Sequence, residues 1–286
     1  MNALELKNVC KSYPSFSLKD ISFALPCGCI MGLVGENGAG KSTTIKLILD
    51  MVQRDSGSIT VFGKEPQRDA AWKEDIGVVL DEVGILECMK AEQVERMMRR
   101  IYRRWDSGMF WDYLARLNVP KDKPFGQFSR GTKMKLGIAV ALSHGAKLLI
   151  LDEATGGLDP VVRDEVLTLF SDFTRSADHA VLISSHIVSD LEKICDYIAF
   201  IHQGRLLLCE EKDRLYEQYR VLHTDATALS KLDAKAVIGV RKNKYDCEAI
   251  VKADALPQGA EASPIDLEQL LITMVKGEKT DDGTSL

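Results

Sequence analysis

The sequence predicts an α/β fold with a mixed sheet at its centre. Cys29–Val34 is a continuous apolar run that stops at a glycine-rich loop, and Lys41–Met51 after it has a helical pattern. Two further apolar runs, Lys147–Leu151 and Ala180–Ser184, are separated by a helix predicted over residues 161–176. Continuous apolarity is typical of strands that are buried on both faces of a sheet. We therefore expect a core sheet flanked by helices.

The other elements of the first 210 residues surround this core. Near the N-terminus, apolar alternation predicts strands that form a β-rich region, and from about residue 89 to 119 the chain becomes helical and locally basic. Before the second apolar run a helix is predicted, and after the third a hairpin that turns at Gln203-Gly204. The predicted strands cover 4–9, 18–25 and 59–62, the helical stretches 89–119 and 132–144, and the hairpin 197–208.

The character of the chain changes after about Lys212. The pattern there is weaker, with a strand pair expected around 237–240 and 247–251. A final helix is predicted to take Ser263 as its N-cap and Pro264 as its first residue, with Gly277 following its last turn. The predicted organisation is a domain over 1–212 (helical subdomain about 85–140), a small α+β accessory segment over 213–277 and a flexible tail over 278–286.

Composition and charge exclude some classes of function. The 286 residues include 37 Lys and Arg against 42 Asp and Glu, a net charge of −5, which argues against a broad grip on nucleic acid. No apolar run reaches the length that spans a bilayer, and the N-terminus lacks the pattern of a signal peptide. Seven scattered cysteines fit reduced thiols. We expect a cytoplasmic protein, or one held at a membrane through a partner.

Residues 35–42 match a phosphate-binding loop in full: Gly35-x-x-x-x-Gly40-Lys41-Ser42. Glycines allow successive backbone N–H groups to face one anion, and the helix that follows adds the positive end of its dipole. The lysine is expected to reach the β- and γ-phosphates, and the Ser42 hydroxyl to coordinate Mg²⁺. The predicted nucleotide contacts are Gly35, Asn37, Gly38, Ala39, Gly40, Lys41, Ser42 and Thr43.

Two carboxylates end the apolar strand at 147–151. Asp152 at a strand end beside the phosphate loop is suited to the magnesium shell, and the adjacent Glu153 is suited to polarise an attacking water. Phosphoryl transfer depends mainly on positioning and on stabilisation of charge, which these two roles supply. Together with the loop, the pair predicts binding and hydrolysis of ATP.

In combination these motifs resemble the nucleotide-binding subunit of ATP-binding cassette (ABC) transporters over about residues 1–210. Phe128-Ser129-Arg130-Gly131-Thr132 stands where that family has its signature, and Asp152–Pro160 covers its acidic motif and D-loop. Ile183–His186 ends a strand as the family's switch histidine does, and Tyr13 matches the aromatic residue that stacks on adenine. The resemblance implies a P-loop NTPase fold of ABC type, with an antiparallel β-subdomain and an α-helical subdomain.

The resemblance also implies a mechanism and partners. Two cassettes, identical or different, would close around two ATP molecules, with Ser129 and Gly131 holding the γ-phosphate of the ATP on the opposite chain. Asp159 in the D-loop would connect the two sites, and His186 would act in hydrolysis. The resemblance implies ATP and Mg²⁺ as ligands and an integral membrane permease as partner, which would place the chain on the cytoplasmic face of the membrane; no nucleic acid partner is expected.

Two positions depart from the usual pattern of the family. Arg130 replaces the first signature glycine, and Asp81 stands where a glutamine often contributes to Mg²⁺ binding. Both departures look like cassettes of the bacterial ABC-2-type exporter branch, and Asp81 is a further candidate metal ligand. The arginine-rich helix around residues 96–104 is either a solvated face or a contact for a membrane subunit or anionic lipid.

Two other classes of function stay open at this point. A non-transport cassette acting on ribosomes or DNA is the main alternative, although the chain has a single phosphate loop and no sustained heptads. A small-molecule or nucleotide kinase shares the loop but does not account for Ser129, Gly131 or His186.

Overall fold

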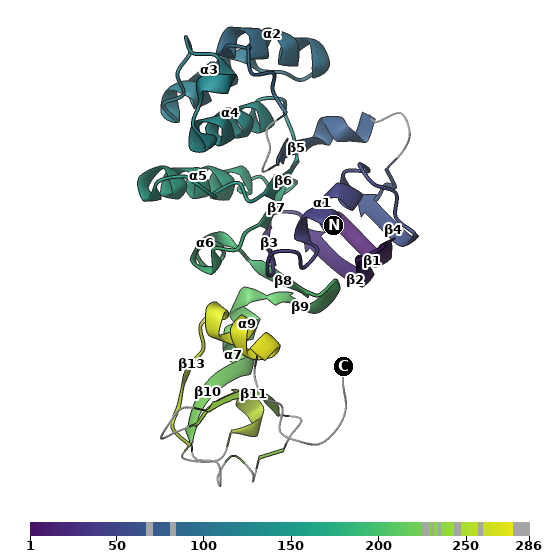
Figure 1. The fold of residues 1–286 in the computed structure, drawn as a ribbon, viewed down its shortest axis with the longest axis vertical. Coiled ribbons are helices and arrows are strands. Elements are labelled where there is room, and N and C mark those ends of the chain that lie inside the picture. The colour runs from purple at the N-terminus through teal and green to yellow at the C-terminus, as the bar shows by residue number, and fades with distance from the viewer. Residues whose placement is uncertain are drawn as a thin grey trace. The chain divides into compact units, whose positions relative to one another are not determined.

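The computed structural model describes residues 1–66, 71–80, 84–224, 229, 232–233, 236–242, 247–256 and 260–276. The chain divides into two compact units, Met1–Cys209 and Glu210–Leu286. Figure 1 shows the elements of each. Among the described residues, no helix combines the length and the apolar character needed to cross a bilayer.

A nine-stranded sheet forms the centre of the first unit, in the order β4-β1-β2-β9-β8-β3-β7-β6-β5. β1 pairs antiparallel with β2 and β4, whereas the ladders β8-β3-β7-β6-β5 are parallel. The sheet is therefore mixed, as predicted. Its strands are β1 (Asn2–Tyr13), β2 (Phe16–Pro26), β3 (Ile30–Val34), β4 (Ser56–Val61), β5 (Ile76–Val79), β6 (Leu148–Asp152), β7 (Ala180–Ser184), β8 (Tyr197–His202) and β9 (Arg205–Glu211).

The burial of the three central strands explains why their sequences are apolar. Every residue of β3, β6 and β7 is buried, because helices cover the faces of this part of the sheet. Ile45 and Ile48 of one helix join Leu33 and Ile150 of the strands in a single apolar cluster. The helices of this unit are α1 (Lys41–Ile48), α2 (Ala91–Ile101), α3 (Ser107–Arg116), α4 (Arg130–Leu142), α5 (Pro160–Phe173) and α6 (Val188–Ile194), with short 3₁₀ turns at Ala71–Asp75 and Phe125–Gln127.

The helical stretch predicted over 89–119 is two helices rather than one. α2 ends at Ile101, and Asp106 then caps α3 by accepting a hydrogen bond from the Met109 amide at 2.9 Å. α4 begins two residues earlier than predicted, because the side chain of Ser129 caps it by accepting from the Thr132 amide at 3.2 Å. The cap fixes the place of the signature residues at the start of a helix.

The second unit contains a four-stranded antiparallel sheet in the order β11-β12-β10-β13. The strand pair predicted around 237–240 and 247–251 is β11 and β12. Leu222, Val240 and Val251 belong to its small apolar core. Its elements are α7 (Lys212–Gln218), β10 (Tyr219–Thr224), β11 (Val237–Lys242), β12 (Cys247–Lys252), a 3₁₀ turn at Ala253–Ala255, β13 (Ala262–Pro264) and α9 (Leu267–Lys276).

The start of the last helix was predicted wrongly. Ser263 and Pro264 lie in β13, which pairs with β10, so they are strand residues instead of the N-cap and first turn. Asp266 takes the capping role: its Oδ1 accepts from the Gln269 amide at 2.6 Å, and its own amide donates to Gln269 Oε1 at 3.4 Å. This reciprocal pair satisfies two helix-end donors at once. Gly277 and the predicted tail lie outside the described residues.

Removing this cap should weaken the second unit locally. We expect Asp266→Ala to lower its free energy of unfolding by about 1 kcal/mol, since a helix-end amide loses its acceptor. Ser263→Ala, which alters the residue that the sequence pattern favoured, removes an exposed hydrogen bond to Nε2 of His223 at 3.1 Å and should lower it by no more than about 0.5 kcal/mol. Denaturant unfolding with amide exchange in α9 measures both. Equal losses in the two variants would contradict the assignment of the cap to Asp266.

Candidate functional site

The phosphate loop joins the buried strand β3 to helix α1. Gly40 precedes the helix with a φ of +119°, no side chain caps the first turn, and no acidic residue lies in that turn. The first backbone N–H groups of α1 therefore stay available for an anion, and the helix dipole adds favourable potential there. The sequence of the loop thus creates an anion-binding end on the helix.

Two glycines of the loop have no room for a side chain. A Cβ on Gly35 would lie 2.3 Å from the Ile201 carbonyl oxygen of β8, and one on Gly40 would lie 2.5 Å from Cδ2 of Leu18 and 3.0 Å from Cζ of Phe16. The loop is held this close to β8 and to the β1–β2 hairpin. These contacts fix where the helix begins.

Lys41 is buried, with 6% of its surface exposed. Its Nζ donates to the carbonyl oxygens of Gly35 at 2.7 Å and Glu36 at 3.2 Å, and it lies 3.9 Å from Oε1 of Glu153. Burial lowers the pKa of the Lys41 ammonium, while the nearby charges of Glu153 and Asp152 act in the opposite direction. A desolvated cation of this kind attracts phosphate more strongly than a cation in water does.

Asp152 ends β6 next to Ser184, the last residue of β7, because the two parallel strands pair in that register. The Ser184 hydroxyl donates to Oδ1 of Asp152 at 2.5 Å. Both side chains are buried. The same serine also accepts from the Glu153 amide, through its carbonyl oxygen at 3.1 Å and its hydroxyl at 3.2 Å. Ser184 therefore holds both carboxylate residues at the strand ends.

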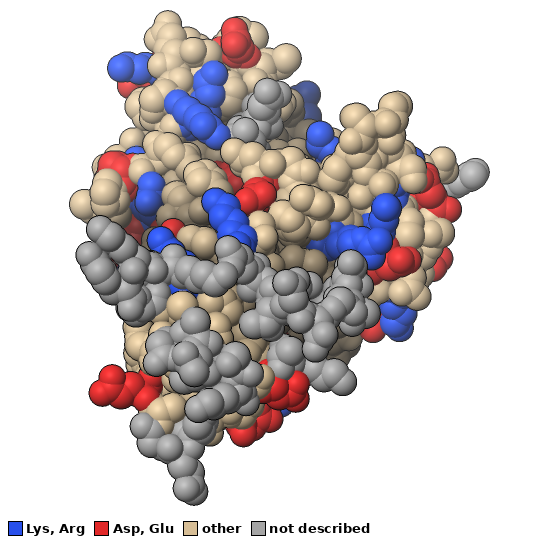
Figure 2. All heavy atoms as spheres, turned by 60° about the horizontal axis from the view of Figure 1, so that its bottom comes forward, with Lys and Arg blue, Asp and Glu red and all other residues tan. Residues whose placement is uncertain are grey.

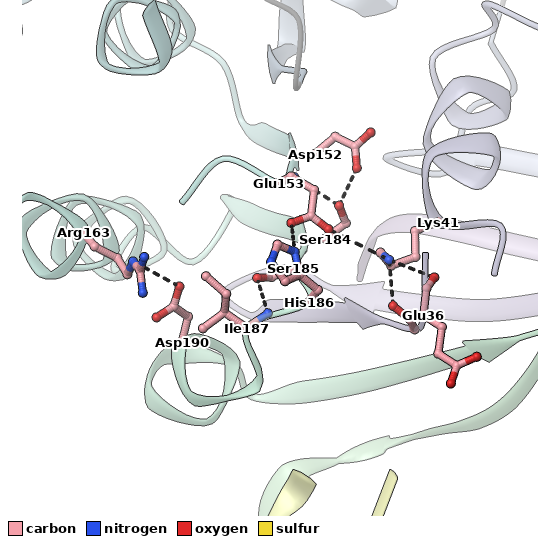
Figure 3. A network of polar contacts seen from close by, with 11 residues as sticks. Glu36, Lys41, Asp152, Glu153, Arg163, Ser184, Ser185, His186, Ile187 and Asp190 are labelled. Atoms are coloured by element: carbon pink, nitrogen blue, oxygen red, sulfur yellow. Dashed lines mark hydrogen bonds and ion pairs between the residues drawn. The ribbon is translucent and has the colours of Figure 1, made fainter. Parts of the chain in front are cut away.

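Glu153 is the centre of the network drawn in Figure 3. Its backbone has a φ of +54°, and its carboxylate lies between the ammonium of Lys41 and the ring of His186. Oε2 of Glu153 is 2.5 Å from Nδ1 of His186. Because a carboxylate only accepts, Nδ1 carries the hydrogen in this contact. The side chain of His186 is 58% exposed, so the pair lies at the surface of the site.

These groups border a single cavity of about 730 Å³. Its volume falls within the range usual for small-molecule sites. The cavity unites the phosphate loop, the acidic strand end and the histidine, as the sequence predicts. It is lined by Ser15, Phe16, Glu36, Asn37, Gly38, Gly40, Lys41, Ser42, Thr43, Arg130, Asp152, Glu153 and His186.

Several of the predicted site residues lie outside the lining of this cavity. Ser129 caps α4, and Asp159 caps α5 by accepting from the Val162 amide at 3.1 Å. A Cβ on Gly131 would lie 3.0 Å from the Gly157 carbonyl oxygen, so the signature residues and the D-loop of one chain are in contact. Ala39 is buried within the loop. Asp81 lies outside the described residues, and its role stays a prediction.

The aromatic end of the cavity differs from the sequence pattern in one detail. Tyr13 ends β1 opposite Phe16, is 40% exposed and is not among the lining residues, whereas Phe16 is. The amine of Lys11 lies 5.6 Å from the centre of the Tyr13 ring. Phe16 was missed because the sequence does not show where a tight turn directs its flanking side chains. Ser184 was missed too, although a hydroxyl ending a buried strand is a usable signal.

Comparisons with known proteins decide the family. The pattern of the ABC transporter family matches residues 18–156. The lantibiotic transport ATP-binding protein SrtF of Streptococcus pyogenes is 35% identical over 213 residues, covering 73% of this chain and 91% of the relative. This chain belongs to the ATP-binding subunits of ABC transporters.

Further relatives and a solved structure agree with this assignment. The linearmycin resistance ATP-binding protein LnrL of Bacillus subtilis is 34% identical, covering 74% of this chain and 70% of the relative. A structure titled as an ATP-binding subunit of an ABC transporter superposes with a TM-score of 0.68 at 26% identity, covering 74% of this chain and 91% of the other. This ABC subunit is thus a transport ATPase, and the ribosome or DNA alternative lacks support from these relatives.

The charge distribution of the ABC subunit is mixed. On the face drawn in Figure 2, Lys and Arg side chains lie among Asp and Glu side chains, and the described residues there form no broad patch of one sign.

The crowding around Gly40 gives a test of the loop geometry. We expect Gly40→Ala to weaken ATP binding at least about tenfold, because the new methyl group would displace Phe16 or the helix start by more than the site tolerates. Gly63→Ala is the matched control: Gly63 also has a positive φ, +75°, but a Cβ there would meet nothing within 4 Å. Nucleotide titration with a check of thermal stability separates the two. Equal affinities in both variants would show that the close contacts of Gly40 do not shape the site.

Proposed function

We propose that this chain hydrolyses ATP at the cavity described above, in a dimer of cassettes, and that hydrolysis drives a separate membrane permease in the direction of export. The contact that best supports the proposed hydrolysis is the one between Glu153 and His186 at 2.5 Å. It lies in the same cavity as the buried lysine of the phosphate loop. The contact combines a candidate base, its orienting partner and an anion site in one place.

The proposed chemistry is attack of water on the γ-phosphorus. Glu153 accepts a proton as the water oxygen forms its bond to phosphorus, the bond to the bridging oxygen breaks, and ADP and inorganic phosphate leave. His186 holds the Glu153 carboxylate through Nδ1 and keeps it in one orientation. Lys41 and the start of α1 stabilise the negative charge of the phosphates, which is the main requirement in this class of reaction.

The residues at the strand end fit a magnesium ion. Ser42 and Asp152 both line the cavity, and Mg²⁺ prefers hard oxygen ligands, with substrate phosphates and waters completing the octahedron. Ser184 engages Oδ1 of Asp152, which orients the carboxylate. We assign Ser42 and Asp152 to Mg²⁺, which when bound would neutralise phosphate charge; Asp81 stays a third candidate.

The proposed dimer assigns a role to residues outside the cavity. Ser129 and Gly131 at the start of α4 would bind the γ-phosphate of the ATP on the partner chain, since a helix start attracts anions. Asp159 at the start of α5 would connect the two sites, as α4 and the D-loop are in contact within one chain. Tyr13 stays the candidate for adenine stacking, with Phe16 as a second aromatic group nearby.

The exporter role rests on the named functions of relatives. One relative is a linearmycin resistance protein, and another is the bacitracin transport protein BcrA of Bacillus licheniformis, which is 34% identical over 67% of this chain and 63% of the relative. Resistance to an antibiotic by transport is achieved by outward movement. We extend this direction to the present chain, together with a place at the cytoplasmic face of the membrane beside the permease.

The base can be tested directly. We expect Glu153→Gln to lower the turnover number at least about 100-fold, because the amide cannot accept the proton of the attacking water. Its affinity for ATP should remain within about threefold of the parent, and the variant should accumulate as an ATP-bound dimer. Glu165→Gln on α5 is the control for loss of one negative charge. A Glu153→Gln variant that hydrolyses ATP at the parent rate would remove Glu153 as the base.

Ser184 gives a test of the proposed metal ligand. We expect Ser184→Ala to raise the Mg²⁺ concentration for half-maximal ATPase activity about 10- to 100-fold, since loss of a hydrogen bond that orients a metal ligand weakens metal binding by roughly this order. Thr168→Ala on α5 removes a hydroxyl that donates to a helix carbonyl and is the control. Magnesium titration of both variants is the measurement. A lower turnover number with unchanged magnesium dependence would contradict this role.

The exporter role needs a reconstituted system. Co-purification would identify the permease, and inside-out vesicles containing both proteins would then be given ATP and a candidate cargo. Accumulation of cargo inside such vesicles is expected for export. ATP-driven loss of cargo that was loaded into them would indicate import, without affecting the assignment as an ATPase.

A further inference from the structure

Arg130 is one of the two residues that depart from the usual pattern of the family. It is the first residue of α4, and it lines the same cavity as Lys41 and Glu153 of its own chain. The two signature residues beside it, Ser129 and Gly131, do not line that cavity. Arg130, which departs from the family pattern, therefore faces the phosphate loop of the same chain.

The Arg130 side chain runs along two adjacent glycines of the D-loop. A Cβ on Gly156 would lie 3.9 Å from Nη2 of Arg130, and a Cβ on Gly157 would lie 3.7 Å from its Cδ. Gly157 has a φ of +76°, a backbone angle that residues with a side chain rarely adopt. Gly156 is buried although it belongs to a loop. The arginine stem thus lies across a surface without side chains.

The same glycine pair connects the guanidinium to the hydrolytic groups. The carbonyl oxygen of Glu153 would lie 3.2 Å from a Cβ on Gly156, so the loop that contacts Arg130 is the one that follows Glu153 directly. Arg130 lines the cavity together with Lys41 and Glu153, the groups at which the terminal phosphate is expected.

The chemistry of the Arg130 side chain suits a phosphate ligand. Among the described residues, the lining of the cavity includes three carboxylates, Glu36, Asp152 and Glu153, and the ammonium of Lys41. A guanidinium can bind two phosphate oxygens at once, and its charge would add to that of Lys41 and of the proposed Mg²⁺ in offsetting the charge of a nucleoside triphosphate.

We propose that Arg130 binds the terminal phosphate of the ATP held by its own chain, before any second cassette closes on it. This role rests on the proposed function but goes beyond it, since there the signature helix binds the nucleotide of the partner chain. It makes Arg130 a residue that selects ATP over ADP in the single subunit. The partner chain's nucleotide is the competing target for the same side chain, and the experiment separates the two.

The experiment measures ATP and ADP affinity at protein concentrations where sedimentation shows monomers only. In Arg130→Gln we expect ATP affinity to fall about 10- to 100-fold, the usual value of one charge-assisted hydrogen bond, and ADP affinity to fall less than about threefold. Arg130→Lys keeps the charge but loses the bidentate geometry, so its ATP affinity should lie between those of the parent and Arg130→Gln.

Lys133→Gln is the matched control. Lys133 lies one turn further along α4, with its amine 4.9 Å from the centre of the Phe125 ring, and does not line the cavity. The Lys133→Gln substitution removes one positive charge, as Arg130→Gln does, and should leave the affinities for ATP and for ADP within about twofold of the parent. Far-ultraviolet circular dichroism of each variant confirms that the fold is intact.

Other outcomes would overturn the proposal. An unchanged ATP affinity of monomeric Arg130→Gln, together with weaker ATP-dependent dimerisation, would assign Arg130 to the nucleotide of the partner chain. Equal losses for ATP and ADP would place its contact away from the terminal phosphate. Failure of the parent chain itself to bind or hydrolyse ATP would be a failure of the proposed function, which these comparisons between variants distinguish from a failure of the Arg130 assignment.

Discussion

The site depends on the register of three parallel strands. β7 lies between β3 and β6, and Ser184 at its end is level with Leu33 on one side and Asp152 on the other. The carboxyl ends of the three strands therefore meet at one edge, where the phosphate loop, the acidic pair and His186 follow them. A shift of either ladder by one residue would displace the strand ends by about 3.3 Å relative to one another and separate these groups.

The buried charges depend on that register in turn. Lys41 is desolvated, and the carboxylates of Glu153 and Asp152 offset the cost by favouring its charged form. A buried cation that loses its partners is strongly destabilising, because its desolvation is then uncompensated. The acidic pair thus has a structural task besides the proposed catalytic one. In a Glu153 variant the Asp152 carboxylate remains and still favours the charged form of Lys41.

The sequence was a good guide where a short motif determines its own geometry. The phosphate loop, the acidic strand end and His186 are each set by neighbours within a few residues, and the structure brings them to one cavity. It was a poor guide where a contact joins distant segments. Ser263 looked like a helix cap by local pattern, yet pairing with β10 holds it in a strand and leaves the cap to Asp266. Phe16 likewise reaches the cavity through the turn that places it against Gly40.

Contact between the signature helix and the D-loop has a consequence for how one chain works. The start of α4 leaves so little space at Gly131 that a Cβ would come within 3.0 Å of the Gly157 carbonyl oxygen, and α5 begins just after that loop. α4 therefore cannot move toward a partner without either carrying the D-loop along or breaking this contact. Glu153 lies only four residues before Gly157, so such a movement also acts on the backbone of the proposed base. In such a cassette, a movement of the signature residues is passed through the D-loop to the hydrolytic groups of the same chain. This holds whether the signature binds the nucleotide of its own chain or that of the partner chain.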